Sequence, residues 1–453
     1  MLVVISDLHF SEAQSTQIGD LRYNRNLSPD TYQSYFSEIN QAATANKVDK
    51  IDLVLAGDIL ELLRSGLWLA NNERPYVRND DIEPDSNSER ILLDIIKAIA
   101  NEERVHDTLD LFHHIQDQFD VAIDVHYLLG NHDRLVNATP AVRKYVRSLF
   151  GLPGEDKLFN YQFILQDHYG KPFCLVRHGH EYDPVNFSIN THEMDGFPEE
   201  FPAAAYGDTC MGDIITIEFG AALAYHLVER YGENSVLGDA TLLTLYQRLM
   251  AFDDVRPTTA LLSFLFSTPG LKKRQTWEMM KPCFIRVLES LSDNPLIEKF
   301  ISDSSNFNKS QQLLLNGLLD SDLLMQDIPY WMIKQIMKRV SKSIKLKSPV
   351  KWVKHEKLIR DTHSGCKCVI SGHTHFPEVS LISALAGDQR YYLNTGTWRN
   401  MIPATKNYQD FGRLEAMAKV IVFPPVKNQN NKAEVPWSFH FLSGVSFGNS
   451  RYF

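Results

Sequence analysis

Short runs of apolar residues recur along the chain, and each run ends at a group of polar or charged residues. The runs lie at 2–6, 52–56, 125–129, 173–177 and 368–371. Their length and their content of branched residues are typical of buried strands. The first strand is expected within the first six residues of the chain.

Helical patterns separate these runs. One helix is expected to begin near Ser28-Pro29, because a serine followed by proline is typical of a first helical turn. A second is expected over roughly 88–117. Strands that alternate with helices predict an α/β fold with a buried sheet. Ligands of such folds gather beyond the carboxyl ends of the strands.

The stretch from 187 to 360 interrupts this alternation. Helices are expected there at 213–231, ending at Gly232, and at 239–251, 258–267, 275–291, 309–320 and 329–345. We therefore divide the chain into a core made of residues 1–186 and 361–453 and a helical insertion or cap at 187–360. Closing strands are expected at 390–398, 416–423 and 435–442.

Composition and charge limit the classes of protein to which this chain is expected to belong. The 453 residues are 44% hydrophobic, enough for a large core, and the net charge of −10 argues against tight non-specific binding of nucleic acid. Five scattered cysteines do not suggest a disulfide framework. There is no signal-peptide pattern and no apolar run of about 18 residues, so we expect no transmembrane helix and a cytoplasmic location.

Five motifs, each after an expected strand, carry the chemistry. They are Asp7-Leu8-His9, Gly57-Asp58, Gly130-Asn131-His132-Asp133, His178-Gly179-His180 and Gly372-His373-Thr374-His375. Carboxylates, imidazoles and a carboxamide together suit two divalent or trivalent transition metals. If the backbone is extended, Asp7 and His9 point the same way, and so do His373 and His375.

One arrangement of the ligands follows from these positions. It puts Asp7, His9, Asp58 and His375 on the first metal and Asp58, Asn131, His178 and His373 on the second. Asp58, at the end of its strand, would bridge the two ions. Any one of these residues alone has an ordinary structural explanation, whereas the ordered set does not.

This pattern resembles the calcineurin-like metallophosphoesterase superfamily in its bacterial form, with a large helical insertion added. The family motifs are D-x-H, G-D, G-N-H-[DE], H and G-H-x-H, and the match covers 1–187 and about 364–400. The resemblance implies a four-layer α/β-β/α sandwich and two metal ions such as Mn, Fe or Zn. It also implies hydrolysis of a phosphodiester or phosphomonoester by a metal-bridging hydroxide.

The resemblance assigns roles to further residues. His132 would face the substrate and protonate the leaving oxygen. Asp133 would orient His132, or would only cap the following turn. Arg134 and Arg399 are candidate phosphate clamps or, alternatively, ordinary surface arginines. His180 would lie near the substrate or replace His178 as a ligand.

Three functions compete at this stage. The first is a hydrolase for a phosphoester that is small, lipid-linked or nucleotide-derived. The second is a nuclease, and the third is a non-catalytic scaffold. Residues 334–357 hold nine Lys or Arg and one acid. This stretch is either a cap helix with a solvated basic face or a surface that attracts an anionic substrate or a membrane headgroup.

Overall fold

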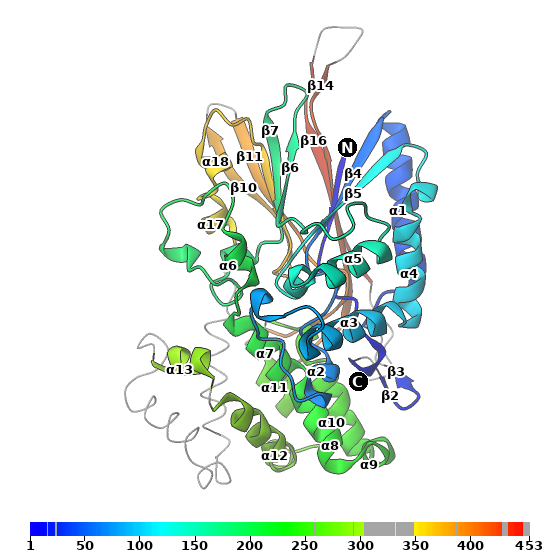
Figure 1. Ribbon diagram of the computed structural model, residues 1–453, viewed down its shortest axis with the longest axis vertical. Helices are drawn as coiled ribbons and strands as arrows, with labels where there is room; N and C mark the ends of the chain where they lie inside the picture. Colours follow the sequence, from blue (N-terminus) through cyan, green and yellow to red (C-terminus); the bar gives the residue numbers. More distant parts are fainter. Residues whose placement is uncertain are drawn as a thin grey trace.

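Two β-sheets packed face to face occupy the centre of the molecule (Figure 1). The computed structural model describes residues 1–15, 17–22, 25–257, 260–292, 294–302, 331, 348–385, 388–427 and 434–446. The first sheet has the order β5-β4-β1-β13-β12-β8, with β16 also paired to β13. Its strands are β1 (Leu2–Ile5), β4 (Lys50–Ala56), β5 (Ala122–Leu128), β8 (Val255–Arg256), β12 (Asn400–Pro403), β13 (Leu414–Phe423) and β16 (Ser438–Ser446).

The second sheet has the order β10-β11-β9-β7-β6. Its strands are β6 (Gln162–Gln166), β7 (Pro172–Arg177), β9 (Cys368–Ser371), β10 (Pro377–Leu385) and β11 (Asp388–Thr395). Two small hairpins complete the strands: β2 (Gln17–Ile18) with β3 (Leu21–Arg22), and β14 (Val426–Lys427) with β15 (Glu434–Val435).

Side-chain alternation explains the layers. Leu2 and Val4 of β1 pack between the sheets with Val176 and Ile370 of the second sheet. Val3 and Ile5 of the same strand point to the opposite face, where they pack against helices. Because both faces of the central strands are buried, these strands are apolar throughout, as the sequence indicated.

Helices cover both outer faces. On the first sheet lie α1 (Pro29–Ala45), α3 (Asn87–Ala100), α4 (Glu103–His113) and α5 (Pro140–Leu149). On the second lie α6 (Ala203–Gly207), α17 (Val350–Val353) and α18 (Lys357–Arg360). The result is the predicted α/β sandwich of four layers, helix–sheet–sheet–helix.

All five strands expected before the motifs are present, as are the helix at 29 and the closing strands. The helix expected over 88–117 is instead two helices, α3 and α4. The break lies at Asn101-Glu102, where the Glu102 carboxylate accepts hydrogen bonds from the first backbone N–H groups of α4. A cap of this kind starts a new helix.

The described part of the insertion is mainly helical. It contains α7 (Met211–Gly220), α8 (Ala222–Tyr231), α9 (Glu233–Gly238), α10 (Ala240–Met250), α11 (Leu261–Phe266), α12 (Lys273–Leu291) and α13 (Pro295–Ser302). Together with the short α2 (Gly66–Ala70), most of them gather at one end of the sandwich (Figure 1). The helix expected over 213–231 is split at Ala221, and α8 ends at Gly232 as expected.

One strand of the insertion was not expected. β8 lies between α10 and α11, and it pairs in parallel with β12, Val255 opposite Ile402. The insertion therefore contributes a strand to the first sheet. The helix expected at 309–320, the helix expected at 329–345 (apart from residue 331) and residues 334–347 of the basic stretch lie outside the described residues. Lys351, Lys354 and Lys357 of that stretch are exposed.

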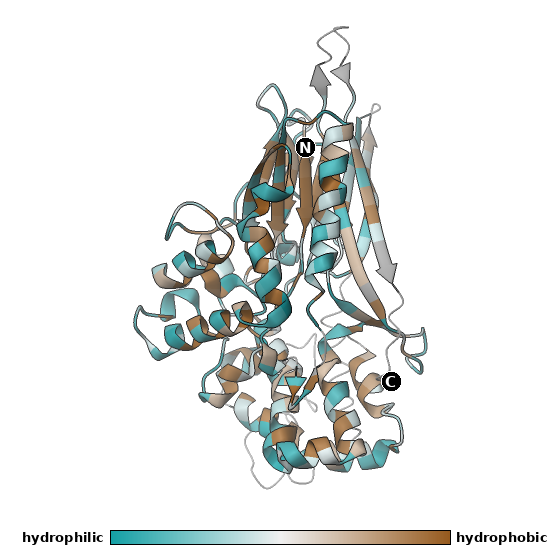
Figure 2. Ribbon diagram, turned by 90° about the vertical axis from the view of Figure 1, so that its right-hand side faces the viewer, coloured by the Kyte–Doolittle hydropathy of each residue, from teal (hydrophilic) through white to brown (hydrophobic). Residues whose placement is uncertain are grey.

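Residues 203–231 are long and apolar enough to cross a membrane, with a mean hydropathy of 1.2 in their most apolar window. Half of that window is buried inside the structure, however, and the segment is divided among α6, α7 and α8. Ile214 and Ile217 belong to the main hydrophobic core. Figure 2 shows that the helices at the lower end of the molecule carry both brown, apolar residues and teal, polar ones. These features are those of a core helix.

Candidate metal centre

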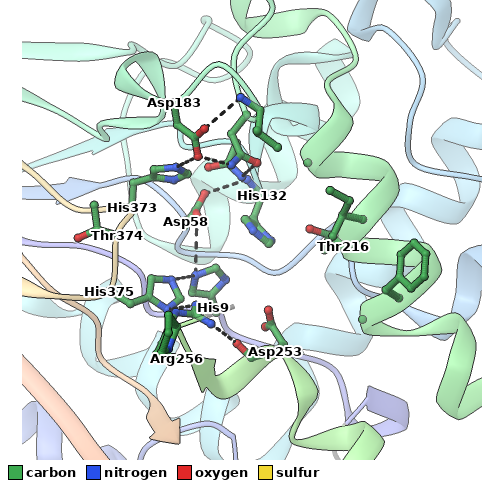
Figure 3. A pocket seen from close by; sticks show the side chains of 18 of the residues that line it. His9, Asp58, His132, Asp183, Thr216, Asp253, Arg256, His373, Thr374 and His375 are labelled. Carbon is green, nitrogen blue, oxygen red and sulfur yellow. Dashed lines mark hydrogen bonds and ion pairs between the residues drawn. The ribbon is translucent and has the colours of Figure 1, made fainter. Parts of the chain in front are cut away.

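The carboxyl ends of five strands bring the five motifs together. β1, β4 and β5 run parallel in the first sheet, and β7 and β9 run parallel in the second. Each motif loop begins where one of these strands ends. The seven predicted metal ligands are thereby brought close together, and Figure 3 shows four of them, His9, Asp58, His373 and His375, around one cavity.

Asp7, His9 and His375 form the first group of ligand atoms, all within 4.8 Å of one another. His9 Nε2 lies 3.1 Å from His375 Nε2, and His375 Nε2 lies 3.3 Å from Asp7 Oδ1. All three side chains are buried. Burial and the nearby Arg256 guanidinium lower the pKa of His375 to about 3, so this imidazole is neutral, as a metal ligand must be.

Asp58, His178 and His373 form the second group, again within 4.8 Å. His178 Nδ1 donates a hydrogen bond of 2.9 Å to the Ala56 carbonyl, and Nε2 lies 3.1 Å from Asp58 Oδ2. A hydrogen bond at one ring nitrogen orients the other toward a metal. The same Asp58 oxygen lies 3.7 Å from His9 Nε2, so Asp58 stands between the two groups.

The charges of His178 and His132 control the ionisation of Asp58. Burial alone would raise the pKa of this carboxyl, but the two imidazoles outweigh burial and hold it well below its ordinary value. Asp58 is therefore a carboxylate, the form that can bridge two cations.

Asn131 supplies an independent sign of a missing partner. Its Oδ1 atom is buried and has no hydrogen-bond partner within the part of the chain that the structure describes, while Nδ2 donates to Asn186. A buried carbonyl oxygen without a partner is costly. The unsatisfied oxygen, the imidazoles and the ionised carboxylates of this set fit a pair of transition metal ions.

The backbone of the ligand loops differs from the expected one. Asp7, His9, Asp58, His373 and His375 all have positive φ, between 47° and 69°. The prediction that these loops are extended is wrong, although their side chains do converge. Non-glycine residues in this region are strained, and the surrounding structure must hold them there. Backbone hydrogen bonds from Asp7 N to Gly57 O and from His9 N to Asp58 O do so.

Glu61 links the first ligand group to His132. Its Oε2 accepts a hydrogen bond of 2.8 Å from His9 Nδ1, and its Oε1 accepts one of 2.8 Å from His132 Nδ1. Burial would raise the pKa of Glu61, but the charges of His132 and His9 prevail and lower it to about 2. In return Glu61 and Asp58 overcome burial and raise the pKa of His132 to about 10.

Asp133 does not make the contact with His132 that would orient it. Its carboxylate accepts hydrogen bonds from Gly130 N, Ile59 N and the Tyr127 hydroxyl, at 2.6 to 2.9 Å. It therefore fastens the loop after β4 to the loop after β5. Glu61 occupies the place that the sequence analysis gave to Asp133, because the chain turns back after Asp58 and returns toward the metal ligands.

Arg134 and Arg399 are also placed differently from expectation. Arg134 is buried away from the cavity, where it donates to Asp213 Oδ2 at 2.8 Å and to the carbonyls of Pro75, Val77 and Gly207. Arg399 is buried against Asp253 and Asp254 at 3.0 and 2.6 Å. Both guanidinium groups are paired with carboxylates, and neither lines the cavity.

His180 lies behind His178 among aromatic rings. Its imidazole packs against Phe187 and Tyr206 and does not line the cavity. Burial lowers its pKa to about 4, so the ring is neutral. This placement removes the expected substrate contact and leaves the fourth-motif ligand position to His178.

The insertion contributes two site residues that motif analysis missed. Arg256, on β8, lines the cavity and donates from Nη2 to His375 Nδ1 at 2.6 Å. Asp253 lines the cavity beside it, as Figure 3 shows. No local sequence pattern marks these residues, because their position depends on the pairing of β8 with β12.

The cavity has a volume of about 230 Å³. The metal ligands and His132 form one wall. The opposite wall comes mainly from α7 and its neighbours and is lined by Val185, Gly212, Ile215, Thr216, Phe219, Gly220, Phe252, Pro257 and Leu261. The site is thus a small pocket between the sandwich and the insertion.

Comparison with known proteins adds little. No protein-family model matches the chain, and no curated protein matches it. The crystal structure of a dimetal phosphatase from Danio rerio is similar at 12% identity, over 92% of this chain and 94% of that chain, with a TM-score of 0.22. Similarity this low supports no conclusion about family or activity.

Proposed function

We propose that this protein is a dinuclear metal-dependent phosphoesterase that hydrolyses a phosphodiester or phosphomonoester. The observation that carries the proposal is the position of the ionised Asp58 between two groups of metal-ligand atoms. Asp7, His9, Asp58 and His375 would hold one ion, and Asp58, Asn131, His178 and His373 the other. Two such ions supply positive charge for the phosphoryl oxygens and lower the pKa of a water molecule.

His132 would supply the proton of the reaction. Its ring lines the cavity, and its Nδ1 is held by Glu61, which leaves Nε2 for the substrate. The raised pKa keeps the imidazole protonated near neutral pH. It would donate that proton to the leaving oxygen as the ester bond breaks.

Arg256 would contact the phosphoryl group in place of Arg134 and Arg399. It is the arginine that lines the cavity among the described residues, and it lies beside the first ligand group. A guanidinium group matches the geometry of phosphate oxygens. Its backbone contacts, to the carbonyls of Asp253 and Val255, hold the side chain at the cavity edge.

The net charge of −10 disfavours the nuclease alternative, because tight binding of a nucleic acid depends on lysine and arginine residues that neutralise its phosphates. The scaffold alternative is disfavoured by the complete ligand set and the unsatisfied Asn131 oxygen.

Hydrolysis of bis-p-nitrophenyl phosphate beside p-nitrophenyl phosphate, with Mn²⁺, tests the proposal. We expect metal-dependent turnover of at least one ester by the wild type and none by Asp58→Asn. The preferred ester distinguishes a diesterase from a monoesterase. Absence of turnover in protein shown to carry two ions would contradict the proposal.

A further inference from the structure

Helix α7 has two opposite faces: one is buried in the core, and the other lines the cavity and touches the core only through the partly buried Phe219. Asp213, Ile214, Ile217 and Glu218 are buried on one side. Gly212, Ile215, Thr216 and Phe219 line the cavity and fall on the other side at 3.6 residues per turn. The core face carries the carboxylates Asp213 and Glu218, whereas the other face is made apolar by Ile215 and Phe219. This apolar face of α7 opens onto the candidate active site.

Two buried ion pairs fix the orientation of α7. Asp213 is paired with Arg134 at 2.8 Å, and Glu218 is paired with Arg74 at 2.6 Å. Both acids project from the core face of the helix. Because they are anchored near its two ends, Ile215 and Phe219 are held toward the metal ligands. Figure 3 shows Thr216 of this face across the cavity from His132.

Most polar side chains near this wall already have partners. Asn186 accepts from Asn131 and donates to Asp183, and Asp253 is paired with Arg399. The Thr374 hydroxyl bonds to the backbone of Phe376. Thr216 is the polar side chain that α7 itself presents.

Apolar side chains from four other segments complete the wall. They are Val185, Phe252, Leu261 and Phe376. Phe376 is 45% exposed, although it is a large apolar residue. Apolar surface that lines a pocket and lies next to polar catalytic groups is typical of a binding site for an organic ligand.

We infer that the substrate is a phosphoester whose organic group is compact and apolar, a short alkyl or aryl group bound by Ile215, Phe219, Phe252, Leu261 and Phe376. This inference rests on the proposed function and names its substrate class. The phosphoryl group lies at the metal ligands and Arg256, and the organic group lies against α7. Sugar or glycerol esters would place hydroxyl groups against the apolar side chains of this wall, which offer them no hydrogen bonds.

Binding of phosphonates to the Mn²⁺-loaded protein tests the inference without turnover. Isothermal titration calorimetry would compare orthophosphate, methylphosphonate, butylphosphonate and 2,3-dihydroxypropylphosphonate. Burial of a methylene strengthens binding by about fourfold. We expect butylphosphonate to bind at least about tenfold more tightly than methylphosphonate, and the dihydroxypropyl compound no more tightly than methylphosphonate.

The outcomes separate the two proposals. Equal affinities for butyl and methyl, or tighter binding of the dihydroxypropyl compound, would overturn the substrate class while metal-dependent phosphate binding upholds the site. If neither orthophosphate nor any phosphonate binds in a Mn²⁺-dependent way, the proposed function fails and the substrate class fails with it.

Matched variants test whether side chains of α7 cause the difference in affinity between butylphosphonate and methylphosphonate. Ile215→Ser should lower the butyl-to-methyl affinity ratio at least threefold. Leu158→Ser, at a leucine that is 61% exposed and does not line the cavity, should keep the wild-type ratio. Thr216→Val, which replaces a hydroxyl with a methyl, should raise the ratio and serves if Ile215→Ser does not fold. An unchanged ratio in folded Ile215→Ser or in Thr216→Val would overturn the inference.

Discussion

The two walls of the cavity are built on different principles. The wall from the sandwich consists of loops at strand ends, where ligand residues adopt left-handed backbone conformations and carry charge. The wall from the insertion consists mainly of helices, whose apolar side chains face inward. In the proposed function, the first wall would hold the metal ions and His132, and the second would contact the organic group. Arg256, which the insertion brings to the edge of the first ligand group, would join the two walls at the phosphoryl group.

Removal of metal should cause the largest loss of activity. All seven proposed metal ligands belong to the sandwich, so the insertion should be unaffected. Dialysis against a chelator is expected to abolish hydrolysis of p-nitrophenyl esters, and Mn²⁺ should restore it. Circular dichroism should show that the helices of the insertion persist. Full activity of protein shown to be metal-free would contradict the proposal that the residues of the sandwich wall act through bound metal ions.

His132→Ala is expected to lower kcat by about 10²–10⁴-fold, the usual range for loss of a general acid. Because His132 is not in either of the two proposed ligand sets, the metal content should stay that of the wild type. Steady-state kinetics and metal analysis of one preparation would check both. Wild-type kcat in the metal-loaded variant would remove His132 from the role of acid.

Glu61→Gln should have a smaller effect, of about 10–100-fold, typical of residues that orient metal ligands. The amide keeps one acceptor and loses the charge that both His9 and His132 contact. We expect lower kcat and weaker Mn²⁺ binding together. Asp133→Asn is the matched comparison, since the Asp133 carboxylate accepts its hydrogen bonds from Gly130, Ile59 and Tyr127 and from no imidazole among the described residues. A loss of Mn²⁺ affinity in Asp133→Asn but not in Glu61→Gln would reverse these assignments.

Arg134 and Arg256 have different expected roles, the first in stability and the second in substrate binding. Arg134→Ala leaves Asp213 buried without its partner and should lower the free energy of unfolding by about 3–5 kcal/mol. Arg256→Ala should instead raise KM about tenfold or more with a small change in melting temperature. Thermal unfolding and kinetics measured on both variants distinguish structural from substrate-binding roles. A higher KM for Arg134→Ala at unchanged stability would restore the phosphate role expected from the sequence.

Local pattern was sufficient to predict which side chains come together at the strand ends. Each strand, the turn that follows it and the candidate ligand lie within a few residues of one another. The sequence around Asp58 or His373 therefore indicates that the residue lies at the end of a strand. The left-handed backbone of those residues is set by hydrogen bonds between loops distant in sequence, such as Asp7 N to Gly57 O, and so could not be predicted. The pairing of Arg134 with Asp213 spans 79 residues and depends on how α7 docks.

The insertion was predictable only as a series of helices. Its apolar segments indicated α7, α8, α10 and α12, but periodicity does not say which helix face meets the core and which meets a cavity. β8 is two residues long and gives no pattern, yet it brings Arg256 to the site. The wall opposite the metal ligands therefore depends on long-range packing, which local sequence patterns do not reveal.

The number of metal ions bound per chain is the direct test of a dinuclear site that contains Asp58. Metal analysis of protein equilibrated with Mn²⁺ should find two ions in the wild type. Asp58→Asn should lose affinity for both. Asp52→Asn, at the opposite end of the same strand, should keep two. A single ion in the wild type, or two tightly bound ions in Asp58→Asn, would contradict a dinuclear site bridged by Asp58.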